Sequence, residues 1–278
     1  MSVRAADFAS GKGHRDENFP VASRLVAPAY RAPILAFYRF ARAADDIADH
    51  ATASAADKLA GLTDMRNGLT GEGAPEAMTL AAAMAERDLD PVHANELLDA
   101  FEQDVRVDRY ANWDDLIAYC RLSAMPVGRF VLDVHGEDRA CWPASDALCA
   151  ALQVINHLQD CGKDYRTLDR VYLPADLLAA TSAAIDDLAR PAATPALRAA
   201  ITLAAERARA LLRESARFAG RIRDRRLSSE VAVIQRLAES LTHRLIDHDP
   251  LAERVHHSKA EAALLAGWAV ARHWARRA

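Results

Sequence analysis

Two rows of polar residues can each lie along one face of a helix, and they constrain the fold more than any other feature. The first row comprises Tyr38, Arg42, Asp45 and Asp49, and the second comprises Gln153, Asn156, Asp160 and Asp164. In each row the two aspartates are four residues apart, which places them about 40° apart around an α-helix. Carboxylates at this spacing repel each other and weaken the helix. Two such pairs facing each other are therefore expected to need cations beside them.

The rest of the chain also favours helices, because apolar residues recur at helical spacing and strand-like alternation is hard to find. We predict helices over 33–49, 53–69, 76–87, 91–108, 112–122 and on to 135, 145–163, 195–220, 228–247 and 258–277. Residues 70–75 and 166–178 are predicted to be irregular. With 278 residues, 51% of them hydrophobic, the chain can bury a substantial core. The sequence therefore predicts one all-α domain over residues 1–278 that holds an apolar cavity, with a flexible N-terminus over 1–17.

Composition narrows the class of protein further. The net charge of −4 gives no overall basic field for nucleic acid. The four cysteines form no C-x-x-C pair, the N-terminus has no apolar core, and no run approaches the roughly 20 apolar residues of a membrane span. A cytoplasmic location is therefore expected. Near the C-terminus, Trp268, Arg272 and Trp274 predict either peripheral contact with the inner face of the membrane or a core helix with a basic end.

The aspartate pairs predict a metal site. Mg²⁺ prefers one or two carboxylates together with water and phosphate oxygens. Two opposed pairs can hold two or three Mg²⁺ ions around a diphosphate ester, whose organic part becomes a carbocation as the diphosphate leaves. The alternative is that both rows are solvated helix faces. The side of the helix opposite the second row is Ala, Leu, Val and Ile, which indicates that the row faces a polar space.

Individual roles follow from this interpretation. The predicted metal ligands are Asp45, Asp49, Asn156, Asp160 and Asp164, and the four aspartates are also the predicted catalytic residues. Asn156 and Gln153 offer neutral polar groups, with bonds to a neighbouring helix as the alternative. Arg42 is the predicted diphosphate contact, and a salt bridge to Asp45 or Asp46 is its alternative role.

Three tyrosines and two further acids complete the candidate set. Tyr38 and Tyr172 are predicted to donate hydrogen bonds to the diphosphate, or to pack with their hydroxyls at a polar edge. Tyr119 is predicted to face the cation, since aromatic rings attract cations, with core packing as the alternative. Asp46 is predicted to support the site from beside the metal ligands. Asp104 borders an apolar helix face, where a lone acid is more often a surface residue.

These motifs resemble the squalene/phytoene synthase family, most strongly over 18–50 and 101–174. The residues that carry the resemblance are Phe19, Pro28, Tyr38, Arg42, Asp45, Asp49, Asp104, Tyr119, Val127, Gly128, the second row, Arg170, Tyr172, Leu173 and Pro174. The resemblance implies an isoprenoid-synthase helical fold, Mg²⁺ as cofactor and prenyl diphosphates as substrates. Enzymes of the family condense two prenyl diphosphates head to head through a cyclopropylcarbinyl diphosphate.

Three departures from the family pattern favour one branch of it. The segment 17–25 differs from the usual start, Met125 stands where glycine is expected, and Gln159 stands where many members carry a diphosphate-binding arginine. This set is similar to the bacterial hopanoid-pathway branch, which ionises presqualene diphosphate and adds water to give hydroxysqualene without NADPH. Its expected neighbours supply presqualene diphosphate and consume hydroxysqualene. The alternatives are an enzyme that makes presqualene diphosphate, squalene or phytoene, or a non-catalytic protein that binds prenyl lipids or assists assembly.

Overall fold

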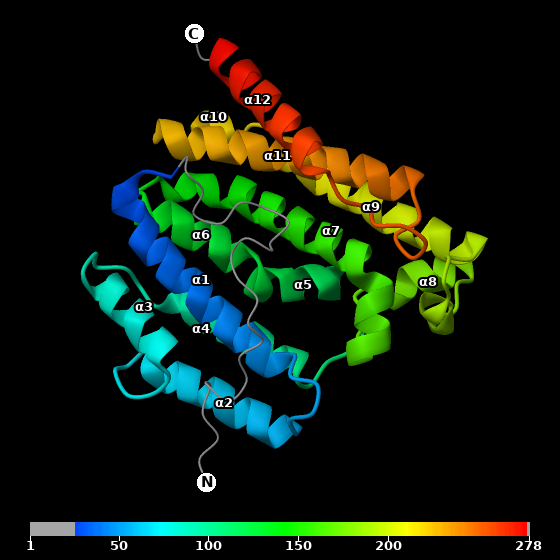
Figure 1. Cartoon of the computed structure of the whole chain (residues 1–278), viewed down its shortest axis with the longest axis horizontal. Coiled ribbons are helices and arrows are strands. Elements are labelled where there is room, and N and C mark those ends of the chain that lie inside the picture. Colours follow the sequence, from blue (N-terminus) through cyan, green and yellow to red (C-terminus); the bar gives the residue numbers. More distant parts are fainter. Residues whose placement is uncertain (1–25, 277–278) are drawn as a thin grey trace. The chain divides into compact units, whose positions relative to one another are not determined.

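The computed structural model describes residues 26–276, and its secondary structure is almost entirely helical (Figure 1). The elements are α1 (Pro28–Ala48), α2 (Ala55–Gly68), α3 (Pro75–Ala85), α4 (Val92–Asp104), α5 (Trp113–Ser123), α6 (Met125–Val134), η2 (Arg139–Cys141), α7 (Trp142–Leu168), α8 (Ala175–Thr181), η3 (Ile185–Ala189), α9 (Pro195–Ser215), α10 (Phe218–Arg221), α11 (Arg225–Asp247) and α12 (Lys259–Ala275). The chain forms two compact units. Unit 1 is Met1–Val107 with Leu122–Arg139, and unit 2 is Asp108–Arg121 with Ala140–Ala278, each described within 26–276.

Unit 1 is built around α1, which packs against α2, α3, α4 and α6. Its core contains a stacked pair of rings, Phe37 and Phe130, whose centroids are 4.0 Å apart. Phe40, Leu62 and Leu97 are almost completely buried beside them. Burying one such side chain contributes about 1.5–3 kcal/mol, so this core fixes the face that α1 turns inward. The polar row of α1 is thereby held on its other side.

The start of α1 depends on two prolines and a distant arginine. Pro28 occupies the first turn, where its missing N–H costs nothing. Pro33 lies inside the helix and cannot donate to the carbonyl of Ala29. That carbonyl accepts a hydrogen bond from Nη2 of Arg87 instead. The helix therefore begins at Pro28. The predicted start at residue 33 is wrong, because Pro33 lies inside the helix and does not mark its first turn.

The contact between α2 and α3 leaves no room for a side chain at Gly68. A Cβ atom there would lie 2.7 Å from Cβ of Ala77 and 2.8 Å from the carbonyl oxygen of Ala74. We expect Gly68→Ala to lower the free energy of unfolding by about 1–3 kcal/mol in urea denaturation, because the two helices must separate. Gly267→Ala in α12 is the matched control, since no atom lies within 4 Å of its Cβ. It should leave stability unchanged or raise it by up to about 1 kcal/mol; equal losses in both variants would contradict the steric explanation.

Unit 2 is organised by α7, which packs against α9 and α11, while α9 also contacts α8 and α11. Buried alanines are frequent on both α7 and α9. They are Ala144, Ala147, Ala150 and Ala151 on α7, and Ala200, Ala204, Ala205 and Ala208 on α9. α12 packs on α11 at the end of the chain (Figure 1). This packing buries one side of α7 and leaves the second polar row on the other.

The predicted all-α fold is confirmed, with corrections at several helix ends. α4 ends at Asp104 rather than 108, and the helix predicted over 195–220 is divided into α9 and α10. α7 is longer than predicted because it continues to Leu168, where Asp169 adopts a left-handed conformation with φ of 50°. α8 lies within the stretch predicted to be irregular. No helix in the described part of the chain is long and apolar enough to cross a bilayer. The N-terminus over 1–17 and Phe19 lie outside the described residues.

Candidate active site

The first polar row lies on a half-buried face of α1 in unit 1. Its members are Tyr38, Arg42, Asp45 and Asp49, and Asp46 lies beside them. Nη1 of Arg42 lies 2.7 Å from Oδ2 of Asp45, and Nη2 lies 2.6 Å from Oδ1 of Asp46. The salt bridge considered as an alternative role for Arg42 is therefore present. It holds the two carboxylates in place from one turn earlier in the helix.

Asp45, Asp46 and Asp49 gather at the C-terminus of α1, which is an unfavourable position for negative charge. Asp49 is the C-cap residue, and the last turn of α1 contains no basic residue. The helix dipole disfavours an anion there by about 0.3–1 kcal/mol each. Lys58 of α2 offsets part of this by donating to the carbonyl of Ala48 at 2.9 Å. The crowded carboxylates lower the stability of the fold but provide a negatively charged place for a cation to bind.

Asp104 adds a further acid to the same place. It is only 9% exposed on α4, so the expectation that it is a surface residue is wrong. Burial, chiefly, and the carboxylate of Asp49 raise the pKa of Asp45, and Asp104 contributes to this increase while Arg42 opposes it. The sequence showed Asp104 beside apolar residues but could not place it near Asp45. Unit 1 thus brings Asp45, Asp49 and Asp104 into one electrostatic neighbourhood.

The second polar row lies along α7 in unit 2 and is also half-buried. Its members are Gln153, Asn156, Asp160 and Asp164, and buried Val154, Ile155 and Leu158 occupy the other side of the helix. Asp164 lies one turn before Leu168, the last residue of α7, and Asp160 lies one turn earlier still. Nε2 of Gln153 lies 3.0 Å from Nε2 of His157.

Hard carboxylate oxygens fit Mg²⁺, which takes few of them and completes its shell with water and phosphate oxygens. Within residues 26–276, no group of three or more His, Cys, Asp or Glu side chains is arranged to hold a metal by itself. A pair of aspartates from either row would therefore need oxygens from water or substrate.

Gln159, one of the expected departures from the family pattern, has a structural contact. Its side chain is buried, and Nε2 donates to the carbonyl of Val255 at 2.5 Å. Val255 belongs to the segment that joins α11 to α12. The side chain at this position therefore anchors that segment to α7.

An aromatic cluster in unit 2 brings Tyr119 and Tyr172 together with two residues that sequence reasoning missed, Tyr110 and His157. The ring of His157 stacks on Tyr172 at a centroid distance of 3.5 Å, and Tyr119 lies 5.3 Å from Tyr110 and 5.7 Å from Tyr172. Tyr119 is 3% exposed, which favours core packing as at least part of its role. The hydroxyl of Tyr172 accepts a hydrogen bond from Nη1 of buried Arg170 at 3.2 Å.

A backbone bridge explains how the cluster forms. Arg109 pairs with Val171 in an isolated parallel bridge, which places the following residues, Tyr110 and Tyr172, side by side. The two bridged segments lie about 60 residues apart in the sequence. Helical periodicity therefore gives no indication that they pair. His157 was missed although it follows Gln153 by four residues, because the row was traced through Asn156 to the two aspartates.

His157 should make stability sensitive to acid. Burial and, second, the charge of Arg170 lower the pKa of His157 to about 3 from an ordinary 6.5. Between pH 6.5 and pH 3, His157 is protonated in the unfolded chain but neutral in the folded chain. The free energy of unfolding therefore decreases as pH falls below about 6.5. At pH 5 the loss from this group is about 2 kcal/mol. Urea denaturation at pH 7 and pH 5 should show a correspondingly smaller decline for His157→Gln than for wild type.

The control for this prediction is His243→Gln, because His243 is exposed on α11. This variant should follow the wild-type pH dependence. If His157→Gln also declines in parallel with wild type, the imidazole of His157 is not held neutral by its surroundings.

Comparisons with known proteins identify the family. The family model described as squalene/phytoene synthase matches residues 13–261. A hydroxysqualene synthase of Zymomonas mobilis is 58% identical over 268 residues, 95% of this chain and 90% of that protein. The structure of squalene synthase HpnC from Alicyclobacillus acidocaldarius is 33% identical with a TM-score of 0.71, and covers 80% of this chain and 85% of its own. A dehydrosqualene synthase structure, 19% identical with a TM-score of 0.81 over 94% of this chain and 93% of its own, shares the fold. The chain belongs to the squalene/phytoene synthase family.

Proposed function

We propose that this protein ionises presqualene diphosphate and adds water to the rearranged carbocation, giving hydroxysqualene and diphosphate in hopanoid biosynthesis. The observation that carries the proposal is the pair of aspartate rows, each of which places two carboxylates four residues apart on a half-buried helix face. A non-catalytic prenyl-lipid carrier has no use for this charge density. The 58% identity to a protein named hydroxysqualene synthase supports this member of the family over the others. Presqualene diphosphate and water balance the products without a reductant, so NADPH is not expected.

We assign Mg²⁺ to the two aspartate rows. Asp45 and Asp49 would hold it on α1, and Asn156, Asp160 and Asp164 on α7. Two or three ions would neutralise the diphosphate and so make it a better leaving group. The fit rests on the chemistry of the donors, since hard oxygens from aspartate suit Mg²⁺ and repel one another without a cation.

The chain's own residues bind and orient the substrate around these ions. Arg42, held by Asp45 and Asp46, presents a guanidinium that can hydrogen-bond to diphosphate oxygens. Tyr38, Gln153 and Tyr172 are assigned to the same substrate. Tyr119 is assigned to the cation, because the faces of aromatic rings attract positive charge.

Product analysis tests the proposal against the other family activities. Purified protein with presqualene diphosphate and Mg²⁺ should yield hydroxysqualene by mass spectrometry, equally with and without NADPH. Squalene formed only with NADPH would identify a reductive enzyme instead. Efficient conversion of farnesyl diphosphate to presqualene diphosphate would show that the protein performs the condensation. Tight prenyl-lipid binding with no turnover would favour the carrier.

The expected surroundings follow from this chemistry. The substrate is a prenyl diphosphate, and neighbouring enzymes would supply presqualene diphosphate and consume hydroxysqualene. We propose a cytoplasmic protein in peripheral contact with the inner face of the membrane, because substrate and product both carry long hydrocarbon chains. We also propose that residues 1–278 act as one functional domain, because the family model matches residues 13–261 without a break.

A further inference from the structure

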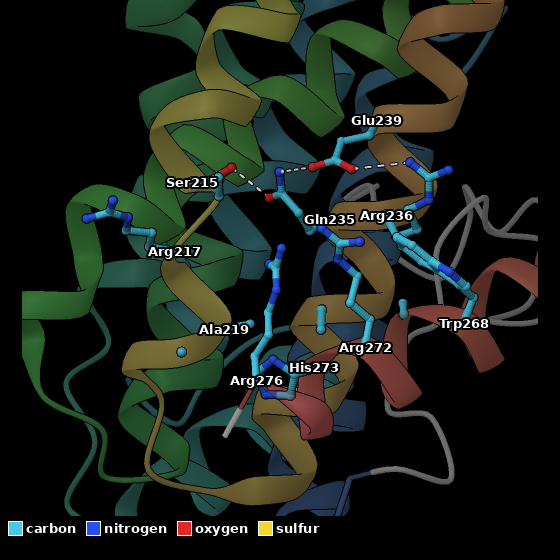
Figure 2. A pocket seen from close by; sticks show the side chains of 14 residues that line it. Ser215, Arg217, Ala219, Gln235, Arg236, Glu239, Trp268, Arg272, His273 and Arg276 are labelled. Carbon is cyan, nitrogen blue, oxygen red and sulfur yellow. Dashed lines mark hydrogen bonds and ion pairs between the residues drawn. The ribbon is translucent and has the colours of Figure 1, made fainter. Parts of the chain in front are cut away.

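A pocket of about 590 Å³ lies within unit 2, away from the aspartates of α7 and among α9, α10, α11 and α12 (Figure 2). The C-terminal end of α9 forms one wall, and α11 and α12 form the others. None of the residues assigned to catalysis or to the aromatic cluster lines it. The proposed reaction therefore leaves this pocket without a role.

The pocket is strongly basic. Arg236, Arg272 and Arg276 line it, together with a single acid, Glu239. Figure 2 shows Arg272 and Arg276 extending from α12 into the space in front of Gln235. Glu239 is already engaged, because it lies 3.5 Å from Arg236 and accepts a hydrogen bond from Gln235 at 3.0 Å. Neither Arg272 nor Arg276 forms an ion pair with any residue of 26–276. The excess positive charge therefore calls for an anionic ligand.

Trp268 organises two of these arginines. The guanidinium carbons of Arg236 and Arg272 lie 5.0 Å and 4.9 Å from the centroid of its ring. Such cation–π contacts restrain the guanidinium while its N–H groups stay available for a phosphate. In addition, Nε of Arg236 is buried with no hydrogen-bond partner in the described structure. The arginines are thus held in position before any ligand binds.

Apolar side chains are exposed next to this basic pocket. Trp268 is 49% exposed, and Leu264, one turn earlier on the same face of α12, is 75% exposed. An exposed Leu–Trp pair continued by Arg272 and Arg276 at four-residue spacing has the character of an interfacial helix, apolar at one end and basic at the other. An exposed leucine would not contribute to binding of nucleic acid or of free phosphate, because neither ligand offers an apolar surface to it.

We propose that this pocket binds the phosphate headgroup of an anionic phospholipid while Leu264 and Trp268 enter the bilayer interface. The inference rests on the proposed function in one respect, since hydrophobic substrate and product give the protein a reason to dock on a membrane. It deepens the proposed membrane contact by naming the surface that makes it. The negative lipid headgroups would pair with Arg272 and Arg276, which have no acidic partner within the described residues.

Vesicle flotation of the full-length protein tests the proposal. Wild type should bind phosphatidylglycerol-containing vesicles at physiological salt and bind pure phosphatidylcholine vesicles weakly. Arg272→Gln and Arg276→Gln should each weaken binding about five-fold, as expected for loss of one arginine at an anionic surface. Trp268→Ala should weaken the binding that persists at high salt, because its contribution is apolar.

Arg190→Gln is the matched control, since it removes the same charge at an exposed site just before α9, whose other end lines the pocket. It should bind vesicles as wild type does. An equal loss in Arg190→Gln, or no binding of wild type to anionic vesicles, would overturn the proposal. Release by millimolar diphosphate at matched ionic strength would instead assign the pocket to soluble phosphates. Turnover of the Arg272 and Arg276 variants in detergent should match wild type, so failure of vesicle binding is distinguishable from failure of the proposed reaction.

Discussion

Asp45→Asn should make the protein more stable and nearly inactive. Asparagine keeps the size of the side chain but removes a charge that burial, Asp49 and Asp104 all disfavour. We expect the free energy of unfolding, measured without Mg²⁺ at pH 7, to rise by about 1 kcal/mol. Turnover of presqualene diphosphate should fall by about 10²–10³-fold, because a group that supports charge separation in the transition state is lost. Asp160→Asn should lose activity to a similar extent.

A matched substitution separates this effect from a general gain on removing an acid. Asp64→Asn changes the same charge on α2 of unit 1, away from the row. It should leave turnover unchanged and change the free energy of unfolding by no more than about 0.5 kcal/mol. Mg²⁺ with diphosphate should raise the melting temperature of wild type and of Asp64→Asn, and raise it much less for Asp45→Asn. Loss of stability together with activity in Asp45→Asn would show that the row is a structural network rather than a metal site.

The sequence predicted the fold well because helical periodicity is a local property. Each polar row could be assigned to one helix face from spacing alone, and the structure places both rows on half-buried faces. The errors lie where a distant residue decides the outcome. Whether a helix can continue through Pro33 depends on what satisfies the carbonyl of Ala29, and Arg87 reaches it from the turn that follows α3.

The candidate site was predicted only where its residues share a helix. Asp45 and Asp49 were found together because four-residue spacing identifies them, whereas Asp104 approaches Asp45 only through the packing of α4 on α1. The aromatic cluster depends on a bridge between Arg109 and Val171, which no local pattern predicts. Gln159 was noticed as a missing arginine, but its bond to Val255 appears only in the folded chain.

Arg42→Gln should lower both activity and stability. In wild type the guanidinium makes close contacts with Asp45 and Asp46, and its side chain is only 21% exposed. Glutamine removes the guanidinium that both carboxylates contact beside Asp49 at the end of α1, so we expect a loss of about 1–3 kcal/mol in the absence of metal. Turnover should fall about 10²-fold, because one fixed charge opposite the diphosphate is lost. Mg²⁺ with diphosphate should reduce the stability difference from wild type, since the metal neutralises the same carboxylates.

The double variant shows whether Arg42 acts through Asp45. In wild type, Asp45→Asn removes both the repulsion by other acids and the attraction to Arg42, so the two effects partly cancel. Without Arg42 only the repulsion remains to be removed. Asp45→Asn should therefore stabilise the Arg42→Gln protein by more than it stabilises wild type, and urea denaturation of all four proteins measures the difference. Equal gains in both backgrounds would mean that the 2.7 Å contact between Arg42 and Asp45 contributes nothing to stability.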